Sequence, residues 1–291
     1  MTTVLITGAT RGLGLATARA TRARGARVLC AGRDQVAVAE VGRLLGAEPV
    51  VLDLGDLRGV RDVAAGLPHV DAVACNAGLQ VLRGPTSTGD GVEETFQVNH
   101  LAHLALVDAL LDRPAPPGRV VLVGSATHDP AVRTGTPDPV EDDDLSVLAT
   151  PGRDSGSPRT AGLRRYATSK LLAAATAAAL ARERPDVHVT CFDPGLMPGT
   201  GLARQYPAPV RALWSTALRG LRVLPFASSP AASGRAFAAL LCEDPPPVPS
   251  GSYVDHRLRV TLPSLRARDT AYQDSVLRQS RELLRRVGQH P

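Results

Sequence analysis

The segment Val4-Leu5-Ile6-Thr7-Gly8-Ala9-Thr10-Arg11-Gly12-Leu13-Gly14 determines the fold that we expect for this chain. Its apolar start is typical of a short buried strand, and its glycines allow a tight turn into a helix. Such a turn lets backbone N–H groups approach a pyrophosphate, which binds at the positive end of the helix. Tight turns also need glycine for purely steric reasons, but the position of this turn between the first strand and the first helix favours a dinucleotide site.

Short apolar runs alternate with helical patterns along the rest of the chain. We expect strands at residues 4–6, 27–33, 50–52, 72–75, 119–124, 187–192 and 250–254. Strands that alternate with helices indicate a parallel sheet. The sequence therefore predicts the α/β class, as a single Rossmann-type, doubly wound parallel sheet over residues 1–291 with helices on both faces.

Composition excludes several classes of function. The net charge is +5, but the arginines are scattered and no basic block with interleaved aromatics appears, so we expect no nucleic-acid partner. The four cysteines lie far apart without a C-x-x-C pair, which argues against a disulfide framework and a metal site. The sequence shows no signal peptide and no apolar run long enough for a membrane span, so we expect a cytoplasmic protein.

The segment 164–170, Arg-Arg-Tyr-Ala-Thr-Ser-Lys, opens a long helix rich in alanine and leucine. Lys170 is the only lysine among the 33 lysine and arginine residues, and Tyr166 shares its helix face four residues earlier. A phenol has a reference pKa of about 10, and a nearby cation favours its ionised form. The pair is therefore a candidate proton donor for carbonyl reduction. The alternative is an exposed Tyr and Lys on an ordinary helix.

The glycine spacing at residues 8–14 resembles that of the short-chain dehydrogenase/reductase family, not the Gly-x-Gly-x-x-Gly of longer dehydrogenases. The resemblance extends from Thr7 to about Val254 and includes six motifs in the family's order. It implies that the adenine amine is reached from the end of the third strand and that an Asn-Ala-Gly turn lies beside the adenine ribose. The cofactor contacts implied in this way are Thr7, Gly8, Arg11, Gly12, Leu13, Gly14, Asp53, Leu54, Asn76, Ala77, Gly78, Tyr166, Lys170, Pro194 and Gly195.

The end of the second strand bears on the choice of cofactor. An acidic residue there binds the adenosine ribose of NAD, whereas an arginine receives the 2′-phosphate of NADP. This chain has Arg33 at that point, and its first acid is Asp34. Arg33, together with Arg11, favours NADP(H) over NAD(H). The alternative is that both are solvated arginines in an arginine-rich chain.

The resemblance implies four catalytic residues: Asn99, Ser125, Tyr166 and Lys170. Ser125 follows the strand 119–124 and would orient the substrate carbonyl, while Tyr166 would donate the proton. Lys170 would lower the pKa of the phenol and hold the nicotinamide ribose. Asn99 would kink its helix, so that its backbone carbonyl holds a water linked to Lys170; the alternative is a buried asparagine satisfied locally.

Two segments carry little pattern and are expected to face the substrate. Residues 128–161 form an insertion rich in Pro, Gly, Asp and Ser, interpreted as a substrate-side flap or else as surface disorder. Residues 196–228 form a substrate-binding segment that contains Trp214. The family's nicotinamide carboxamide contact falls on Gly199, with Thr200 one place later, so it is not assigned. We expect His128 in a loop, with a place in the pocket lining as the alternative, and His100 and His103 as packing or helix-surface residues.

Within the family, the Asn-His-Leu, Asp-Asp-Leu and Tyr-Ala-Thr-Ser-Lys segments resemble retinol dehydrogenases, protochlorophyllide reductases and bacterial aromatic-polyketide ketoreductases. The alanine, arginine, glycine and proline content is typical of a GC-rich genome and favours the last group. We therefore expect NADPH-dependent reduction of a bulky aromatic or polycyclic ketone, or oxidation of the alcohol in reverse, by a monomer or homodimer. Two alternatives are a light-dependent reductase of a tetrapyrrole C=C bond and a non-catalytic NADP(H)-binding redox sensor.

Overall fold

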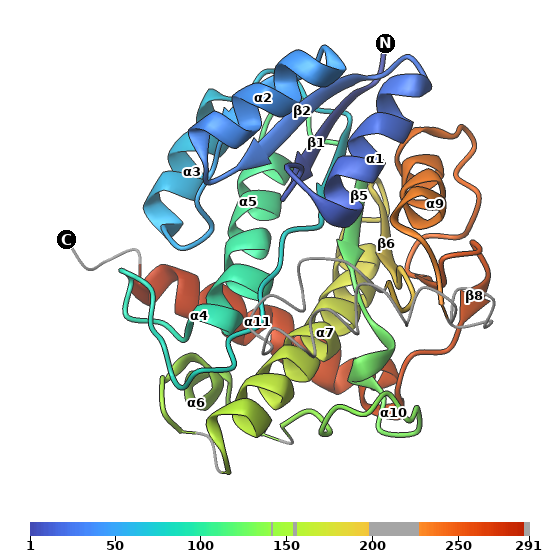
Figure 1. Cartoon of the computed structure of the whole chain (residues 1–291). Helices are drawn as coiled ribbons and strands as arrows, with labels where there is room; N and C mark the ends of the chain where they lie inside the picture. The colour runs from blue at the N-terminus through green and yellow to red at the C-terminus, as the bar shows by residue number, and fades with distance from the viewer. Residues whose placement is uncertain (141, 154–155, 198–226, 288–291) are drawn as a thin grey trace, which may run out of the picture.

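A mixed sheet of eight strands forms the centre of the computed structural model, which describes residues 1–140, 142–153, 156–197 and 227–287 (Figure 1). The strand order is β3-β2-β1-β4-β5-β6-β7-β8, and neighbouring strands are parallel up to β7, while β8 is antiparallel to β7. The strands are β1 (Thr3–Thr7), β2 (Arg27–Gly32), β3 (Glu48–Val51), β4 (Ala72–Cys75), β5 (Arg119–Val123), β6 (His188–Phe192), β7 (Tyr253–Val254) and β8 (Val260–Thr261).

Helices cover both faces of this sheet, which confirms the predicted doubly wound α/β fold. Side chains alternate along β1, so that Leu5 joins one core cluster and Val4 and Ile6 join the other. The Leu5 cluster includes residues of α3 (Leu57–Gly66), α5 (Ala102–Leu111), α7 (Pro158–Glu183) and α11 (Thr270–Val287). The opposite cluster includes residues of α1 (Gly12–Ala23), α2 (Gln35–Leu45) and α9 (Pro230–Cys242).

The strand order defines where a ligand would bind. β1 lies between β2 and β4, so the chain winds outward from β1 in both directions. Ligands of open α/β sheets bind outside the carboxyl ends of the strands at this reversal. The glycine turn after β1, the segment after β4 and Ser125 after β5 all lie at that edge.

The C-terminal helix α11 covers the helices of the larger core cluster. Figure 1 shows α11, in red, passing behind α7. It buries Tyr272, Val276, Leu277 and Leu284 in the cluster that includes the leucines and alanines of α7. Among the described residues no helix is both long and apolar enough to cross a membrane.

Two elements near the C-terminus differ from expectation. The last predicted strand, 250–254, is ordered as a strand only from Tyr253, and it pairs with β8, which the sequence did not predict. β8 has only two residues, too few to show a period of two. By contrast, the start of helix α9 carries a clear sequence signal, because Ser229 caps it by accepting from the N–H of Ala232 and a proline follows at the first helical position.

Candidate active site

Helix α7 brings Tyr166 and Lys170 together inside the protein. Ser157 caps the helix by accepting from the N–H of Thr160 at 3.2 Å, and a proline follows at the first helical position. Only 8% of Tyr166 and 5% of Lys170 is exposed, and the Lys170 Nζ lies 5.4 Å from the centre of the phenol ring. The alternative of an exposed pair on an ordinary helix is therefore wrong.

Ser125 reaches the same point from the sheet. It directly follows Gly124 at the end of β5 and caps a short 3-10 helix, η2 (Ala126–His128). Its side chain is near enough to the Tyr166 phenol to lower the pKa of that group. Three of the four predicted catalytic side chains thus meet at the carboxyl end of β5.

Burial dominates the electrostatics of this pair. It raises the pKa of Tyr166, the Asp193 carboxylate adds to the effect, and the nearby Ser125 side chain opposes it. Burial also lowers the pKa of Lys170 to about 8. Because burial sets the direction of the shift at Tyr166, the expected lowering of the phenol pKa by Lys170 stays a prediction.

Asn99 lies in a π-helical turn, η1 (Gln97–Leu101), which joins α4 (Glu94–Phe96) to α5. The expected distortion of the helix is therefore present. Its side chain donates to the Leu79 carbonyl at 2.9 Å and to Ser169 Oγ at 3.0 Å, and it accepts from the Leu79 N–H at 2.8 Å. The side chain is thus buried and satisfied locally, while the water link from its backbone carbonyl to Lys170 stays a prediction.

His100 and His103 are packing residues, as expected. His100 Nε2 lies 2.7 Å from Ser280 Oγ on α11, and His103 Nε2 lies 3.0 Å from Thr7 Oγ1. Burial lowers their pKa values to about 3 and about 4. In the part of the chain that the structure describes, no group of three or more His, Cys, Asp or Glu side chains could hold a metal ion.

The glycine turn is bound to the segment after β4. The Thr7 hydroxyl accepts from the backbone N–H groups of Asn76 and Ala77, each at 2.9 Å, and the Asn76 amide donates back to the Thr7 carbonyl at 2.7 Å. A Cβ atom on Gly14 would lie 2.2 Å from the Gly8 carbonyl oxygen, so close packing of helix and strand requires glycine there. A Cβ atom on Gly12, whose φ is +57°, would meet nothing within 4 Å. The start of α1 therefore leaves room for a ligand to approach its backbone.

The residues expected to choose the cofactor lie after β2 and β3. Arg33 is exposed, and the acid that follows it, Asp34, caps α2 by accepting from the N–H of Ala37 at 3.1 Å. Asp53 is exposed and accepts from the N–H of Gly55 at 2.8 Å, while Leu54 is buried. The parallel pairing of β1 with β2 and of β2 with β3 brings these positions to the same edge as the glycine turn.

After β6, the Asp193-Pro194-Gly195 turn lies beside the catalytic group. Gly195 has φ +72° and donates its N–H to Asp193 Oδ1 at 2.9 Å, while the Pro194 carbonyl accepts from Ser233 Oγ at 2.7 Å. The sequence did not indicate a role for Asp193, whose half-buried carboxylate also raises the pKa of Tyr166. An acid directly after a strand that ends at the site was the available signal. Gly199, Thr200 and Trp214, within the expected substrate segment 196–228, lie outside the described residues.

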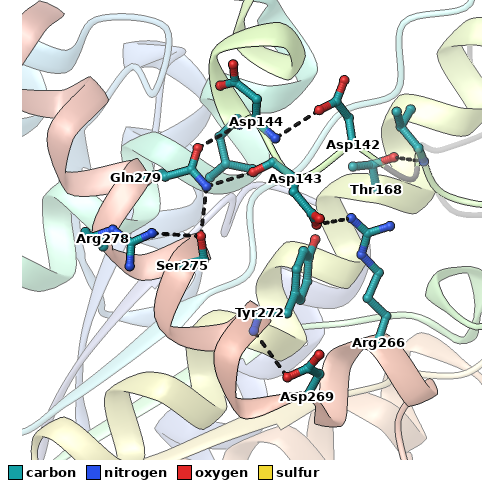
Figure 2. Close-up of polar contacts among 12 residues, drawn as sticks. Asp142, Asp143, Asp144, Thr168, Arg266, Asp269, Tyr272, Ser275, Arg278 and Gln279 are labelled. Atoms are coloured by element: carbon teal, nitrogen blue, oxygen red, sulfur yellow. Dashed lines mark hydrogen bonds and ion pairs between the residues drawn. The ribbon is translucent and has the colours of Figure 1, made fainter.

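Part of the insertion is anchored to the C-terminal helices, as Figure 2 shows. Arg266 of α10 (Leu265–Arg268) pairs with Asp143 at 2.6 Å. Gln279 of α11 accepts from the N–H of Leu145 at 3.1 Å and donates to the Asp143 carbonyl at 2.7 Å. Leu145, the first residue of α6 (Leu145–Ala149), is fully buried. Surface disorder therefore does not describe this part of the insertion.

The same part lies on a different face of α7 from the catalytic pair. The N–H of Val140 donates to Thr168 Oγ1 at 2.8 Å. Thr168 is two residues from Tyr166, which is about 200° around the helix. Val140 therefore contacts α7 away from the face that carries Tyr166. A flap over Tyr166 stays a prediction only for the first part of the insertion.

Comparisons with known proteins agree with this geometry. The chain matches a family model described as short chain dehydrogenase over residues 2–135. It is 37% identical over 203 residues to the Streptomyces sp. (strain C5) protein named "Putative daunorubicin C-13 ketoreductase DnrU", covering 66% of this chain and 65% of that protein. It is 32% identical over 236 residues to protochlorophyllide reductase B of Hordeum vulgare, covering 72% and 60%.

A crystal structure of an uncharacterized protein from Mycobacterium paratuberculosis matches 98% of this chain and 94% of its own, with a TM-score of 0.72 and 27% identity. The chain spans less than two thirds of the length of the two curated relatives. Taken together, the family model, the relatives and the fold identify the family. The chain belongs to the short-chain dehydrogenase/reductase family of oxidoreductases.

Proposed function

We propose that the protein is an NADPH-dependent ketoreductase for a bulky aromatic or polycyclic ketone, and that it oxidises the corresponding alcohol in reverse. The observation that carries this proposal is the proximity of Ser125 to the buried Tyr166 phenol, with Lys170 one turn further along α7. The Streptomyces relative, which is named as a ketoreductase, supports the same reaction.

The cofactor would supply a hydride to the carbonyl carbon. Ser125 orients the carbonyl oxygen by donating its hydroxyl hydrogen. Tyr166 then gives its proton to that oxygen, so that an alcohol forms. The raised pKa of Tyr166 keeps the phenol protonated at neutral pH, as a general acid requires. The Lys170 ammonium stabilises the phenolate that remains until solvent returns the proton.

The choice of NADP(H) rests on the residues after β2. The Asp34 carboxylate caps α2 by accepting from the N–H of Ala37. It is therefore already hydrogen-bonded near the position where an acid would bind the ribose of NAD. The exposed guanidinium of Arg33 is available to a 2′-phosphate, a group that arginine binds with two parallel hydrogen bonds. Arg11 at the start of α1 is the second candidate contact.

Two other functions follow from the same site. The likeness to a protochlorophyllide reductase favours reduction of a C=C bond in light as a second candidate. A cofactor-binding sensor without turnover would not require Ser125 and Tyr166 to meet.

We propose a monomer over a homodimer, because α11 covers the outer side of α7. Light scattering after gel filtration measures the oligomeric state directly.

The test is the loss of reduced-nicotinamide absorbance with NADPH and with NADH, against a panel of aromatic and polycyclic ketones. Turnover that prefers NADPH, proceeds in darkness and is abolished in Tyr166→Phe supports the proposal. Turnover that requires light favours the C=C reductase. Tight NADPH binding without turnover of any ketone favours the sensor, and a preference for NADH overturns the cofactor assignment alone.

A further inference from the structure

His128 lies three residues after Ser125, and only 2% of it is exposed. Its Nδ1 atom lies 2.7 Å from the Ser125 backbone carbonyl oxygen, and its Nε2 atom lies 3.0 Å from the backbone nitrogen of Ser264. A carbonyl oxygen only accepts and a backbone N–H only donates. The ring therefore carries its proton on Nδ1 and is neutral, and burial, which lowers the pKa of His128, favours the same state.

The ring is also held by packing. It lies 4.9 Å from the ring of Tyr253, centre to centre. The same tyrosine packs against Gly124, where a Cβ atom would lie 2.9 Å from Tyr253 Cε2. Gly124, directly before Ser125, and His128, three residues after it, thus both pack against Tyr253. The Tyr253 hydroxyl donates to Asp193 Oδ2 at 3.2 Å, which fixes the ring in turn.

Ser264, whose N–H donates to His128 Nε2, is held in a fixed position. Ser264 is buried, and its hydroxyl caps α10 by accepting from the N–H of Ala267 at 3.3 Å. Two residues later, Arg266 pairs with Asp143 of the insertion. The Ser264 N–H therefore presents a fixed donor to His128, supplied by a segment 136 residues further along the chain.

The bridge acts on the orientation of Ser125. The residue is extended, with φ −174° and ψ 147°, and its hydroxyl oxygen accepts from the N–H of Thr127 at 3.3 Å. Rotation about ψ would move the Ser125 carbonyl away from His128 and would move Thr127 relative to the hydroxyl. A hydrogen bond to the carbonyl therefore restrains the side chain that contacts Tyr166.

We propose that His128 is a positioning residue for Ser125, which it holds against Tyr166 by bridging the Ser125 carbonyl to the Ser264 N–H. This role rests on the proposed function, because it concerns the residue that orients the substrate carbonyl. His128 itself does not touch the reacting atoms. Its loss should therefore lower kcat and leave cofactor binding unchanged.

The first test compares three substitutions of His128. His128→Phe keeps the packing on Tyr253 and loses both hydrogen bonds, and we expect kcat for ketone reduction to fall about 10- to 100-fold with an unchanged Kd for NADPH. His128→Asn places an amide nitrogen near the Nδ1 position, so we expect it to recover more of kcat than His128→Gln. His188→Phe is the matched control: its Nε2 contacts the Val248 carbonyl at 2.8 Å near the start of β6, and its kcat should equal that of the wild type.

The second test removes the bridge without changing the histidine. Ser264→Pro deletes the backbone N–H at a φ of −51°, which proline tolerates, whereas Ser264→Ala keeps the N–H and loses only the cap. We expect kcat about tenfold lower in Ser264→Pro than in Ser264→Ala. This pair also decides the question if His128→Phe does not fold.

Equal kcat values in the two Ser264 variants, or wild-type kcat in a folded His128→Phe, would overturn the role of His128 and leave the proposed function standing. No better turnover in His128→Asn than in His128→Phe would equally overturn it. A wild-type protein that reduces no ketone would overturn the proposed function, and the role of His128 with it.

Discussion

The Nζ atom of Lys170 donates a 2.9 Å hydrogen bond to the backbone carbonyl of Val123, the last residue of β5. The bond ties helix α7 to the strand that delivers Ser125, two residues later. The only lysine of the chain therefore has a structural contact as well as a charge beside the Tyr166 phenol. Because a guanidinium is wider and planar, arginine does not fit the same contact.

We expect the lowered pKa of Lys170 to be visible in the pH dependence of protein stability. Its pKa falls from 10.5 to about 8 in the folded protein, so between these values the unfolded chain binds more protons than the folded one. Lys170 should therefore contribute a rise of about 3 kcal/mol in the free energy of unfolding across this window, opposite in sign to the contribution of the buried cysteines, and this rise should be absent from Lys170→Met. Urea denaturation of both proteins on either side of the window measures the difference, and parallel curves would contradict the assignment.

The activity should change in the opposite sense. As the ammonium loses its proton above pH 8, the phenolate left on Tyr166 loses its stabilising charge, so kcat for ketone reduction should decline. Lys170→Arg keeps a charge at all these pH values. It should nevertheless be less active throughout, because the wider guanidinium does not fit the contact with the Val123 carbonyl. A wild-type rate that stays level well above pH 8 would speak against the role of the ammonium.

The sequence predicted the sheet, the edge at which the site lies and the pairing of Tyr166 with Lys170 for a physical reason. Buried parallel strands are apolar runs, and the glycine turn at 7–14 has both a sterically demanding spacing and a fixed place after β1. Tyr166 and Lys170 could be paired because helix geometry alone places them on one face. These inferences need only local sequence.

The relationships that the sequence did not reveal connect distant residues. His128 and Ser264 are 136 positions apart, and no local pattern announces their hydrogen bond. Likewise, the charge of Lys170 was visible beside Tyr166, but the burial and the Asp193 carboxylate that raise the phenol pKa were not. The short helix α6 was missed because its five residues are too few for a period.

Gly124→Ala should destabilise the protein and disturb Ser125. A Cβ atom there would lie 2.8 Å from Cys191 Sγ and 2.9 Å from Tyr253 Cε2, both of which belong to the packed core. We expect a loss of about 1–3 kcal/mol in the free energy of unfolding, together with a lower kcat. Gly66→Ala, at the end of α3 with nothing within 4 Å of its Cβ position, is the control and should lose nothing. Equal stability of the two variants would show that the site can relax.

Arg33→Ala should change the preference between the two nicotinamide cofactors. A charge-assisted hydrogen bond contributes about 1.5–3 kcal/mol, so we expect the Kd for NADPH to rise at least about tenfold while the Kd for NADH stays the same. Arg43→Ala, an exposed arginine in the last turn of α2, removes the same charge away from the strand ends and should leave both constants unchanged. Fluorescence titration with each cofactor measures the effect, and an equal loss for both would point to a general electrostatic effect.

Arg281→Met should weaken the attachment of α11 to the helices beneath it. The Arg281 guanidinium pairs with Asp108 of α5 at 2.9 Å and with Glu183 of α7 at 2.7 Å. Because burial already raises the pKa of Asp108, removal of the cation leaves a carboxylate that is costly to keep ionised. All three side chains are partly exposed, so solvent screening limits the expected loss to about 1–2 kcal/mol of unfolding free energy. Arg286→Met, which breaks an exposed pair with Glu282 on α11 alone, should lose less than about 0.5 kcal/mol. Urea midpoints that fall equally in both variants would mean that the bridge to α5 and α7 does not hold the helix in place.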